Sequence, residues 1–174
     1  MNIYLVGFMG VGKTTVGKIL AEKLNKEFIE TDELIEKKEN KTIVEIFAQK
    51  GEPYFRKLEK EILQEIAKRD NLVVSCGGGL ICNEENLKTL KETGLVFNLT
   101  ASSKTIYDRT KNYKNRPLLN VDNPLRQIET LLEKRKPYYD KAHYSINTEG
   151  ISPHQVVELI LEKIKDGKKK FYTT

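Results

Sequence analysis

A short stretch near the start of the chain has the residue types needed to bind phosphate groups. Residues 7–15, with the sequence GFMGVGKTT, fit the pattern G-x-x-x-x-G-K-[ST] at every fixed position. Glycines let the backbone curl with its N–H groups turned inward, and a helix that follows adds its positive end to the same anion site. The lysine supplies a full charge to phosphates, and the hydroxyl after it is an oxygen ligand for Mg²⁺. The pattern predicts that ATP phosphates are bound by Gly10, Val11, Gly12, Lys13, Thr14 and Thr15, with Thr14 as a Mg²⁺ ligand.

Two acidic residues follow the second apolar run, in the sequence Glu30-Thr31-Asp32. In an extended strand, residues two apart point to the same side, so both carboxylates would approach the phosphate site at the carboxyl end of a parallel strand. One carboxylate would then serve the metal and the other an acceptor hydroxyl. The same residues also fit an alternative in which Asp32 only caps the N-terminus of a helix.

Three glycines and three arginines are the remaining candidates for ligand contacts. Gly77–Gly79 follow an apolar run, so a third strand would end in a loop whose backbone N–H groups face a ligand. Arg56 falls in an expected helix, Arg116 in a polar loop, and Arg135 in a helix that we expect to end at Pro137. Taken singly, an arginine is usually a surface residue, so these positions gain meaning only together.

Short apolar runs alternate with helical repeats along the chain and would position these residues. The runs occur at residues 3–6, 28–29, 72–74, 95–99 and 144–146. Between them, apolar residues recur on one helical face, as at residues 16–24, 55–66, 125–132 and 156–164. Buried parallel strands need helical crossovers on both faces, so the order predicts an α/β fold: a three-layer αβα sandwich with a five-stranded parallel sheet. Residues 1–174 would form one domain, with the polar residues 111–123 as a lid.

The composition is ordinary for a cytosolic protein, and we expect a cytoplasmic monomer. The chain of 174 residues has a formal net charge of +5, with Lys and Arg spread among nearly as many Asp and Glu. No basic stripe indicates a nucleic-acid partner, and the surplus suits a small polyanion. The apolar start of the chain lacks a basic n-region and contains glycines, so we expect neither an export signal nor a membrane span. Cys76 and Cys82 fit no zinc-ligand spacing and are expected to be reduced thiols.

Together these motifs resemble the shikimate kinase family over nearly the whole chain. The resemblance rests on the P-loop, the acidic pair, the glycine triplet, Gly51-Glu52 with Phe55-Arg56 and Glu59, Arg116-Pro117-Leu118-Leu119, and Arg135 with Pro137 and Tyr139. It implies a P-loop kinase with the nucleoside monophosphate kinase-like fold. It also implies that ATP phosphorylates the 3-hydroxyl of shikimate, giving shikimate 3-phosphate and ADP in aromatic amino acid biosynthesis.

The same resemblance implies a role for each candidate residue. Lys13, Asp32 and Arg116 would be catalytic, with Asp32 orienting or deprotonating the 3-hydroxyl and Arg116 closing over ATP. Arg109 and Pro153 would sandwich the adenine. Shikimate would bind beside a helical region at residues 32–62, and the residues expected to contact it are Asp32, Arg56, Gly77, Gly78, Gly79 and Arg135, with Phe47 and Phe55 as walls.

One position departs from the family pattern, and two other functions share part of it. Glu30 stands where the family commonly has Asp, and we expect its longer side chain to reach Mg²⁺ through a water. Another P-loop kinase of small metabolites, such as a gluconate kinase, would fit the P-loop and the arginines equally. A nucleotide-binding switch would need N-K-x-D to recognise guanine and D-x-x-G to sense the γ-phosphate. Residues 25–28 lack the required Asp, and D-x-x-G does not occur in the chain.

Overall fold

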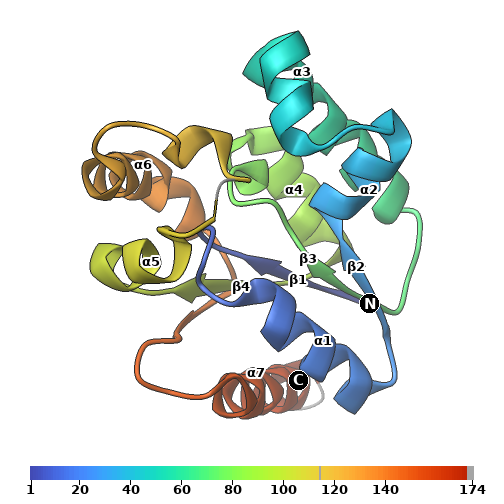
Figure 1. Ribbon diagram of the computed structural model, residues 1–174. Helices are drawn as coiled ribbons and strands as arrows, with labels where there is room; N and C mark the ends of the chain where they lie inside the picture. Colours follow the sequence, from blue (N-terminus) through green and yellow to red (C-terminus); the bar gives the residue numbers. More distant parts are fainter. Residues whose placement is uncertain (114, 172–174) are drawn as a thin grey trace.

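All five expected strands are present, and they form one parallel sheet. The computed structural model describes residues 1–113 and 115–171, so position 114 of the expected lid lies outside the described residues. The strand order is β2-β3-β1-β4-β5 (Figure 1). The strands are β1 (Asn2–Val6), β2 (Glu27–Glu30), β3 (Leu72–Ser75), β4 (Gly94–Thr100) and β5 (Tyr144–Asn147). The predicted five-stranded parallel sheet is confirmed.

Helices connect the strands and cover both faces of the sheet. Within the described ranges they are α1 (Lys13–Leu24), α2 (Thr31–Glu39), α3 (Ile43–Ile66), α4 (Glu84–Thr93), α5 (Ser103–Thr110), α6 (Pro124–Tyr139) and α7 (Pro153–Phe171). Two 3₁₀ turns, η1 (Leu80–Cys82) and η2 (Pro117–Leu119), lie between them, the second inside the expected lid. None of the described helices is long and apolar enough to cross a lipid bilayer.

The core consists of two apolar clusters, one on each face of the sheet. Successive residues of a strand point to opposite faces, so Tyr4 and Val6 of β1 join one cluster while Ile3 and Leu5 join the other. The first cluster packs mainly against α2, α3 and α4, and the second against α1, α7 and parts of α5 and α6 (Figure 1). Each fully buried aliphatic side chain contributes roughly 1.5–3 kcal/mol to folding. The predicted three-layer sandwich is therefore the observed architecture.

The strand order places three of the sequence motifs at one edge of the sheet. The central strand β1 lies between β3 and β4, so the chain crosses in opposite directions on its two sides. Open α/β sheets bind ligands in the crevice at the carboxyl end of such a switch point. The P-loop follows β1, Glu30 ends β2, and the glycine triplet follows β3 after one intervening residue.

Helix α3 is kinked, and helix α6 ends later than expected. Helix α3 contains a kink at Gly51, where φ is 78° and ψ is 172°, and Pro53 follows in the next turn. Helix α6 was expected to end at Pro137, but it continues to Tyr139. That expectation was wrong because a proline removes one N–H donor, and near a helix end the backbone tolerates the loss.

The residue before β5 fixes the edge strand through its side chain as well as its backbone. The His143 N–H donates to the Val96 carbonyl at 3.0 Å, and the Val96 N–H donates to His143 Nδ1 at 3.0 Å. A ring nitrogen that accepts a hydrogen bond carries no proton, so the contact needs the neutral imidazole. Burial, and then the charge of Lys91, lowers the pKa of His143.

We expect this contact to make stability depend on pH. As the pH falls below about 6.5, His143 takes up a proton in the unfolded chain but stays neutral in the folded protein. The free energy of unfolding therefore decreases with falling pH, until the pH drops below the lowered pKa of His143 in the folded protein. His143→Asn keeps an acceptor oxygen and removes the titration, so its stability should fall less between about pH 7 and pH 5. Urea denaturation at several pH values measures both proteins. Parallel pH profiles would contradict the assignment.

Candidate functional site

The sequence motifs converge on one cavity at the carboxyl edge of the sheet. Its volume is about 950 Å³, and it is bounded by the P-loop, α2, α3, the glycine triplet, the lid segment and α6. The predicted residues that line it are Gly10, Gly12, Lys13, Thr14, Thr15, Glu30, Asp32, Phe47, Phe55, Arg56, Gly77, Gly78, Gly79, Arg109, Arg116 and Arg135. Of the candidates, Val11 has its side chain buried in the core and Pro153 is exposed at the start of α7.

The P-loop takes the backbone shape that its glycines permit. Gly10 and Gly12 have φ values of 81° and 101°, a left-handed region that other residues rarely adopt, and α1 begins immediately afterwards. Lys13 reaches back over the loop, where its ammonium donates to the carbonyls of Gly7 and Phe8 at 2.9 Å each. Burial lowers the pKa of Lys13 to about 8, with Asp32 opposing and Arg116 reinforcing the shift. The loop thus presents N–H groups, a helix start and a buried cation to an anion.

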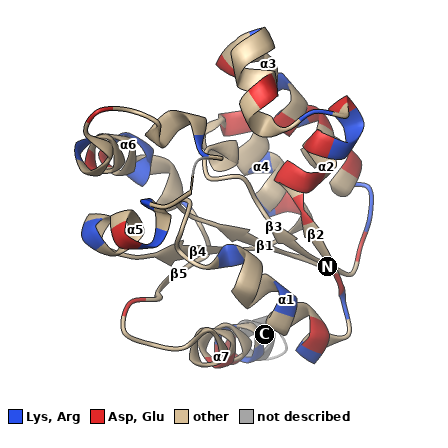
Figure 2. Cartoon of the chain, in the orientation of Figure 1, with Lys and Arg blue, Asp and Glu red and all other residues tan. Residues whose placement is uncertain are grey.

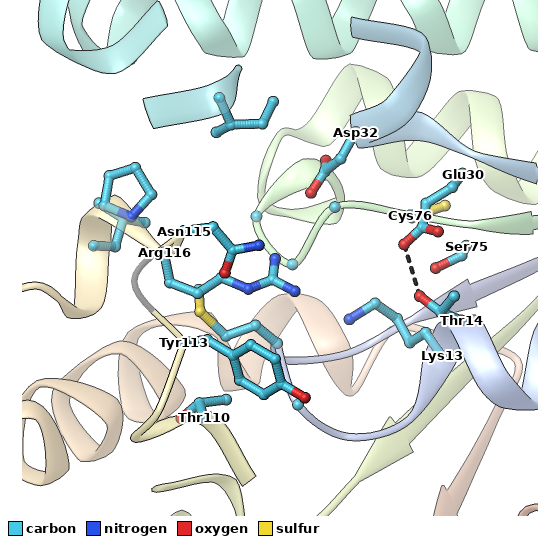
Figure 3. A pocket seen from close by; sticks show the side chains of 18 of the residues that line it. Lys13, Thr14, Glu30, Asp32, Ser75, Cys76, Thr110, Tyr113, Asn115 and Arg116 are labelled. Carbon is cyan, nitrogen blue, oxygen red and sulfur yellow. Dashed lines mark hydrogen bonds between the residues drawn. The ribbon is translucent and has the colours of Figure 1, made fainter. Parts of the chain in front are cut away.

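Thr14 and Glu30 meet on the cavity wall, which fits the expected metal. The Thr14 hydroxyl donates to Glu30 Oε1 at 2.6 Å (Figure 3), and Ser75 lies beside Glu30 in the strand register. Hydroxyl and carboxylate oxygens are the donors that Mg²⁺ prefers. In the described part of the chain, no three His, Cys, Asp or Glu side chains cluster as a metal site. The donor set therefore suits a Mg²⁺ ion held jointly with nucleotide phosphates and water.

Asp32 lies on a helix and not on a strand, which corrects the sequence argument. Strand β2 ends at Glu30, and Asp32 is in the first turn of α2, where Glu30 occupies the N-cap. Both the strand-parity argument and the alternative of Asp32 as N-cap were therefore wrong, although both carboxylates do line the cavity. Among the described residues Asp32 Oδ1 is buried without a hydrogen-bond partner. Burial raises the pKa of Asp32, while the charges of Arg116 and Lys13 oppose this.

The three glycines of the triplet lie where neighbouring side chains leave little room for a Cβ atom. None of its residues has a positive φ. A Cβ atom on Gly77 would lie 2.7 Å from Asp32 Oδ1 and 2.8 Å from Glu59 Oε1, and one on Gly79 would lie 2.5 Å from Arg56 Nη1. Two carboxylates and a guanidinium thus rest directly on this backbone.

Two arginines from different helices face the cavity with different pairing. Arg56 Nη1 donates to Glu59 Oε2 at 2.6 Å, and its Nη2 donates to Glu52 Oε1 at 2.9 Å. Arg135 is 6% exposed, and within the described residues its Nη1 has no hydrogen-bond partner. A buried guanidinium with an open donor is suited to a carboxylate, which it can bind with two parallel hydrogen bonds.

Glu59 is a site residue to which sequence reasoning gave no role. It is 1% exposed, and burial raises its pKa to about 7 although Arg56 opposes this. The signal available was its spacing, three residues after Arg56 on one helix, where opposite charges meet. Glu59 holds the Arg56 guanidinium against the triplet.

The remaining candidates form the walls and the lid side of the cavity. The rings of Phe47 and Phe55 have centroids 4.9 Å apart at an angle of 47°. The Arg116 guanidinium points into the cavity between Asp32 and Lys13 (Figure 3). Arg109 Nη1 donates to the Gly10 carbonyl at 3.2 Å, which places Arg109 beside the P-loop. Lys and Arg residues occur on α1, α5 and α6, whereas α2 and α3 carry many acidic residues together with some basic ones (Figure 2).

The cavity therefore has two chemically distinct ends. The P-loop end suits a triphosphate, and the other end combines buried carboxylates with two guanidinium groups. Such a pair of subsites can align a phosphoryl donor with a hydroxyl on a small acid.

Comparison with known proteins gives one consistent family. The shikimate kinase family matches residues 9–165. The shikimate kinase of Sulfurihydrogenibium sp. is 52% identical over 94% of this chain and 98% of its own length, and that of Thermodesulfovibrio yellowstonii is 46% identical over 96% and 98%. A solved structure, the shikimate kinase from Acinetobacter baumannii in complex with shikimate, superposes with a TM-score of 0.93 at 43% identity, over 96% of this chain and 94% of that one.

The lowered pKa of Lys13 predicts that nucleotide binding takes up protons. At pH 8 about half of the Lys13 side chains are neutral, and phosphate charge favours the ammonium, so ATP should bind with uptake of about half a proton. Affinity should weaken as the pH rises above that value. Calorimetry in buffers of different ionisation enthalpy measures the uptake. Lys13→Arg keeps a permanent charge and should abolish it; equal uptake in this variant would show that Lys13 is not the source.

Proposed function

The chain belongs to the shikimate kinase family, and from this premise we propose how its own residues bind and phosphorylate shikimate. The protein is an ATP-dependent kinase that acts on a hydroxyl of shikimate, in aromatic amino acid biosynthesis. One observation carries the residue assignment: a single cavity joins the P-loop to Asp32, Arg56 and Arg135.

The two arginines bind the substrate carboxylate in this proposal. Shikimate is a small ring with one carboxylate and three hydroxyls, so it needs fixed cations at one end and acceptors at the other. Arg56 already has Glu59 as its counter-ion, whereas Arg135 has an open buried donor. The substrate carboxylate completes the charge balance of the pair. The Gly78 N–H donates to the substrate, and Phe47 and Phe55 pack against the ring.

Asp32 holds the 3-hydroxyl and takes its proton. Its buried, unpartnered Oδ1 is an acceptor that a substrate hydroxyl satisfies. The 3-oxygen forms a bond to the γ-phosphorus as the bond from that phosphorus to the β–γ bridging oxygen breaks, and the proton moves to Asp32 while ADP leaves. Lys13 and Arg116 stabilise the negative charge that moves between the two oxygens. The described lid residues, 111–113 and 115–123, close over the cavity and exclude water, which would otherwise hydrolyse ATP.

Further assignments complete the nucleotide side. Thr14, and Glu30 through a water, would hold Mg²⁺, and the ion would supply positive charge to the phosphates of ATP. Arg109 and Pro153 flank the adenine, and the P-loop backbone from Gly10 to Thr15 holds the phosphates. We also propose that the enzyme works as a monomer in the cytoplasm, without a nucleic-acid or membrane partner.

A product assay tests the proposed reaction against its nearest alternative. ATP is supplied with shikimate or with gluconate, ADP release is followed, and phosphorus NMR locates the new phosphate ester. We expect turnover with shikimate and an ester on its 3-hydroxyl, with only background ADP release from gluconate. Turnover on gluconate alone would overturn the proposed function, and an ester on another hydroxyl would overturn the placement of Asp32.

Asp32→Asn should lower kcat by roughly 10²- to 10⁴-fold, the usual effect of removing a positioned proton acceptor. The amide keeps the size of the carboxylate and leaves the P-loop intact, so the KM for ATP should change little. Asp70→Asn is the matched control, because this exposed aspartate undergoes the same chemical change outside the cavity. Steady-state kinetics measure all three enzymes. Near wild-type turnover of Asp32→Asn would rule out its role as proton acceptor.

A further inference from the structure

Tyr139 connects the last turn of α6 to the glycine triplet. It is 5% exposed, its ring packs in the core, and its hydroxyl donates to the Gly78 carbonyl at 2.6 Å. Burial raises the pKa of Tyr139 to about 12, so the phenol keeps its proton and remains a donor at neutral pH. Arg135 lies four residues earlier on α6, and therefore one turn away on the same face.

Gly78 lies where the P-loop, the triplet and Arg135 come together. A Cβ atom on this glycine would be 3.2 Å from Arg135 Nη1, 3.4 Å from the Met9 nitrogen and 3.5 Å from the Gly7 carbonyl oxygen. A small rotation of the backbone at Gly78 would therefore change its distance to the arginine and to the P-loop together. Glycine has the largest backbone freedom of any residue, so the backbone here needs external restraints.

Side-chain hydrogen bonds restrain the triplet from two sides. The Gly77 N–H donates to Thr31 Oγ1 at 2.8 Å, and the Tyr139 hydroxyl donates to the Gly78 carbonyl. Thr31 is the neighbour of Asp32 at the start of α2, and Tyr139 is one turn from Arg135 on α6. Each restraint thus ties the loop to a helix that carries a proposed substrate contact.

We propose that Tyr139 is a positioning residue of the acceptor site: by holding the Gly78 carbonyl it limits backbone rotation at Gly78, which orients the N–H of the same residue relative to Arg135, so that this N–H and the guanidinium bind shikimate together. Tyr139 touches neither shikimate nor ATP in this arrangement. It acts through the backbone of Gly78, and its ring contributes separately to the core. The inference rests on the proposed placement of shikimate between Arg56 and Arg135.

Tyr139→Phe removes only the hydroxyl and tests this role. Loss of one buried hydrogen bond to a positioning group should raise the KM and the Kd for shikimate about 5- to 10-fold. The KM for ATP should stay unchanged and kcat should change less than twofold. Tyr138→Phe, the adjacent tyrosine on α6, is the matched control and should leave shikimate binding unchanged. The melting temperatures of both variants are compared with that of the unsubstituted protein, which shows how much each hydroxyl contributes to stability.

A double-mutant cycle with Arg135→Lys separates positioning from general weakening. If Tyr139 acts through the Gly78–Arg135 arrangement, its substitution should have a smaller effect once Arg135 has been replaced. Additive effects, an unchanged KM for shikimate, or equal changes in the KM values for both substrates would overturn the proposal. Absence of shikimate turnover in the unsubstituted protein would instead overturn the proposed function, so the two failures are distinct.

Discussion

Charge held away from water is the constraint on which the rest of this site depends. Glu59 and Arg135 are buried, Lys13 and Asp32 are half-buried, and desolvation moves the pKa of Lys13 to about 8 and that of Glu59 to about 7. Leaving such groups without counter-charges is expensive, and their mutual attraction offsets only part of the penalty. A donor rich in phosphate and an acceptor with one carboxylate and several hydroxyls supply the missing partners. The same desolvation therefore creates the preference of the site for its substrates.

The sheet makes this concentration of charge geometrically possible. Parallel strands end at a common edge, so residues far apart in the chain, such as Thr14, Glu30 and Ser75, come within hydrogen-bond reach or strand register of one another. The acids and arginines on helices are then brought against a backbone that has no side chains. Carboxylates and a guanidinium reach the triplet at distances that a single Cβ atom would prevent. Rigid packing of both sheet faces keeps these short approaches in place.

The sequence predicted the layers, the strand positions and most of the cavity because those features follow from periodicity and from one well-defined motif. It failed where the outcome depends on the residue at which one element ends and the next begins: nothing in Glu30-Thr31-Asp32 shows that the strand stops at Glu30 and that Asp32 lies on a helix. The pairing of Glu59 was accessible from its helical spacing, but its burial depends on tertiary packing. The bond from Tyr139 to Gly78 joins residues 61 positions apart, and no local pattern encodes it.

Because Gly79 contacts Arg56, a substitution at Gly79 would affect the stability of the fold and the activity of the enzyme to different degrees. A methyl group at Gly79 would collide with the guanidinium alone, the end of a long and partly exposed side chain, which can swing aside only by giving up its ion pair with Glu59. The displaced cation would also leave the place from which it binds substrate. Mutational surveys scored by abundance or thermal stability would therefore rate this glycine as moderately sensitive, while growth without aromatic amino acids would rate it as intolerant. The difference between the two scores would thus mark residues that shape the cavity more than they support the fold.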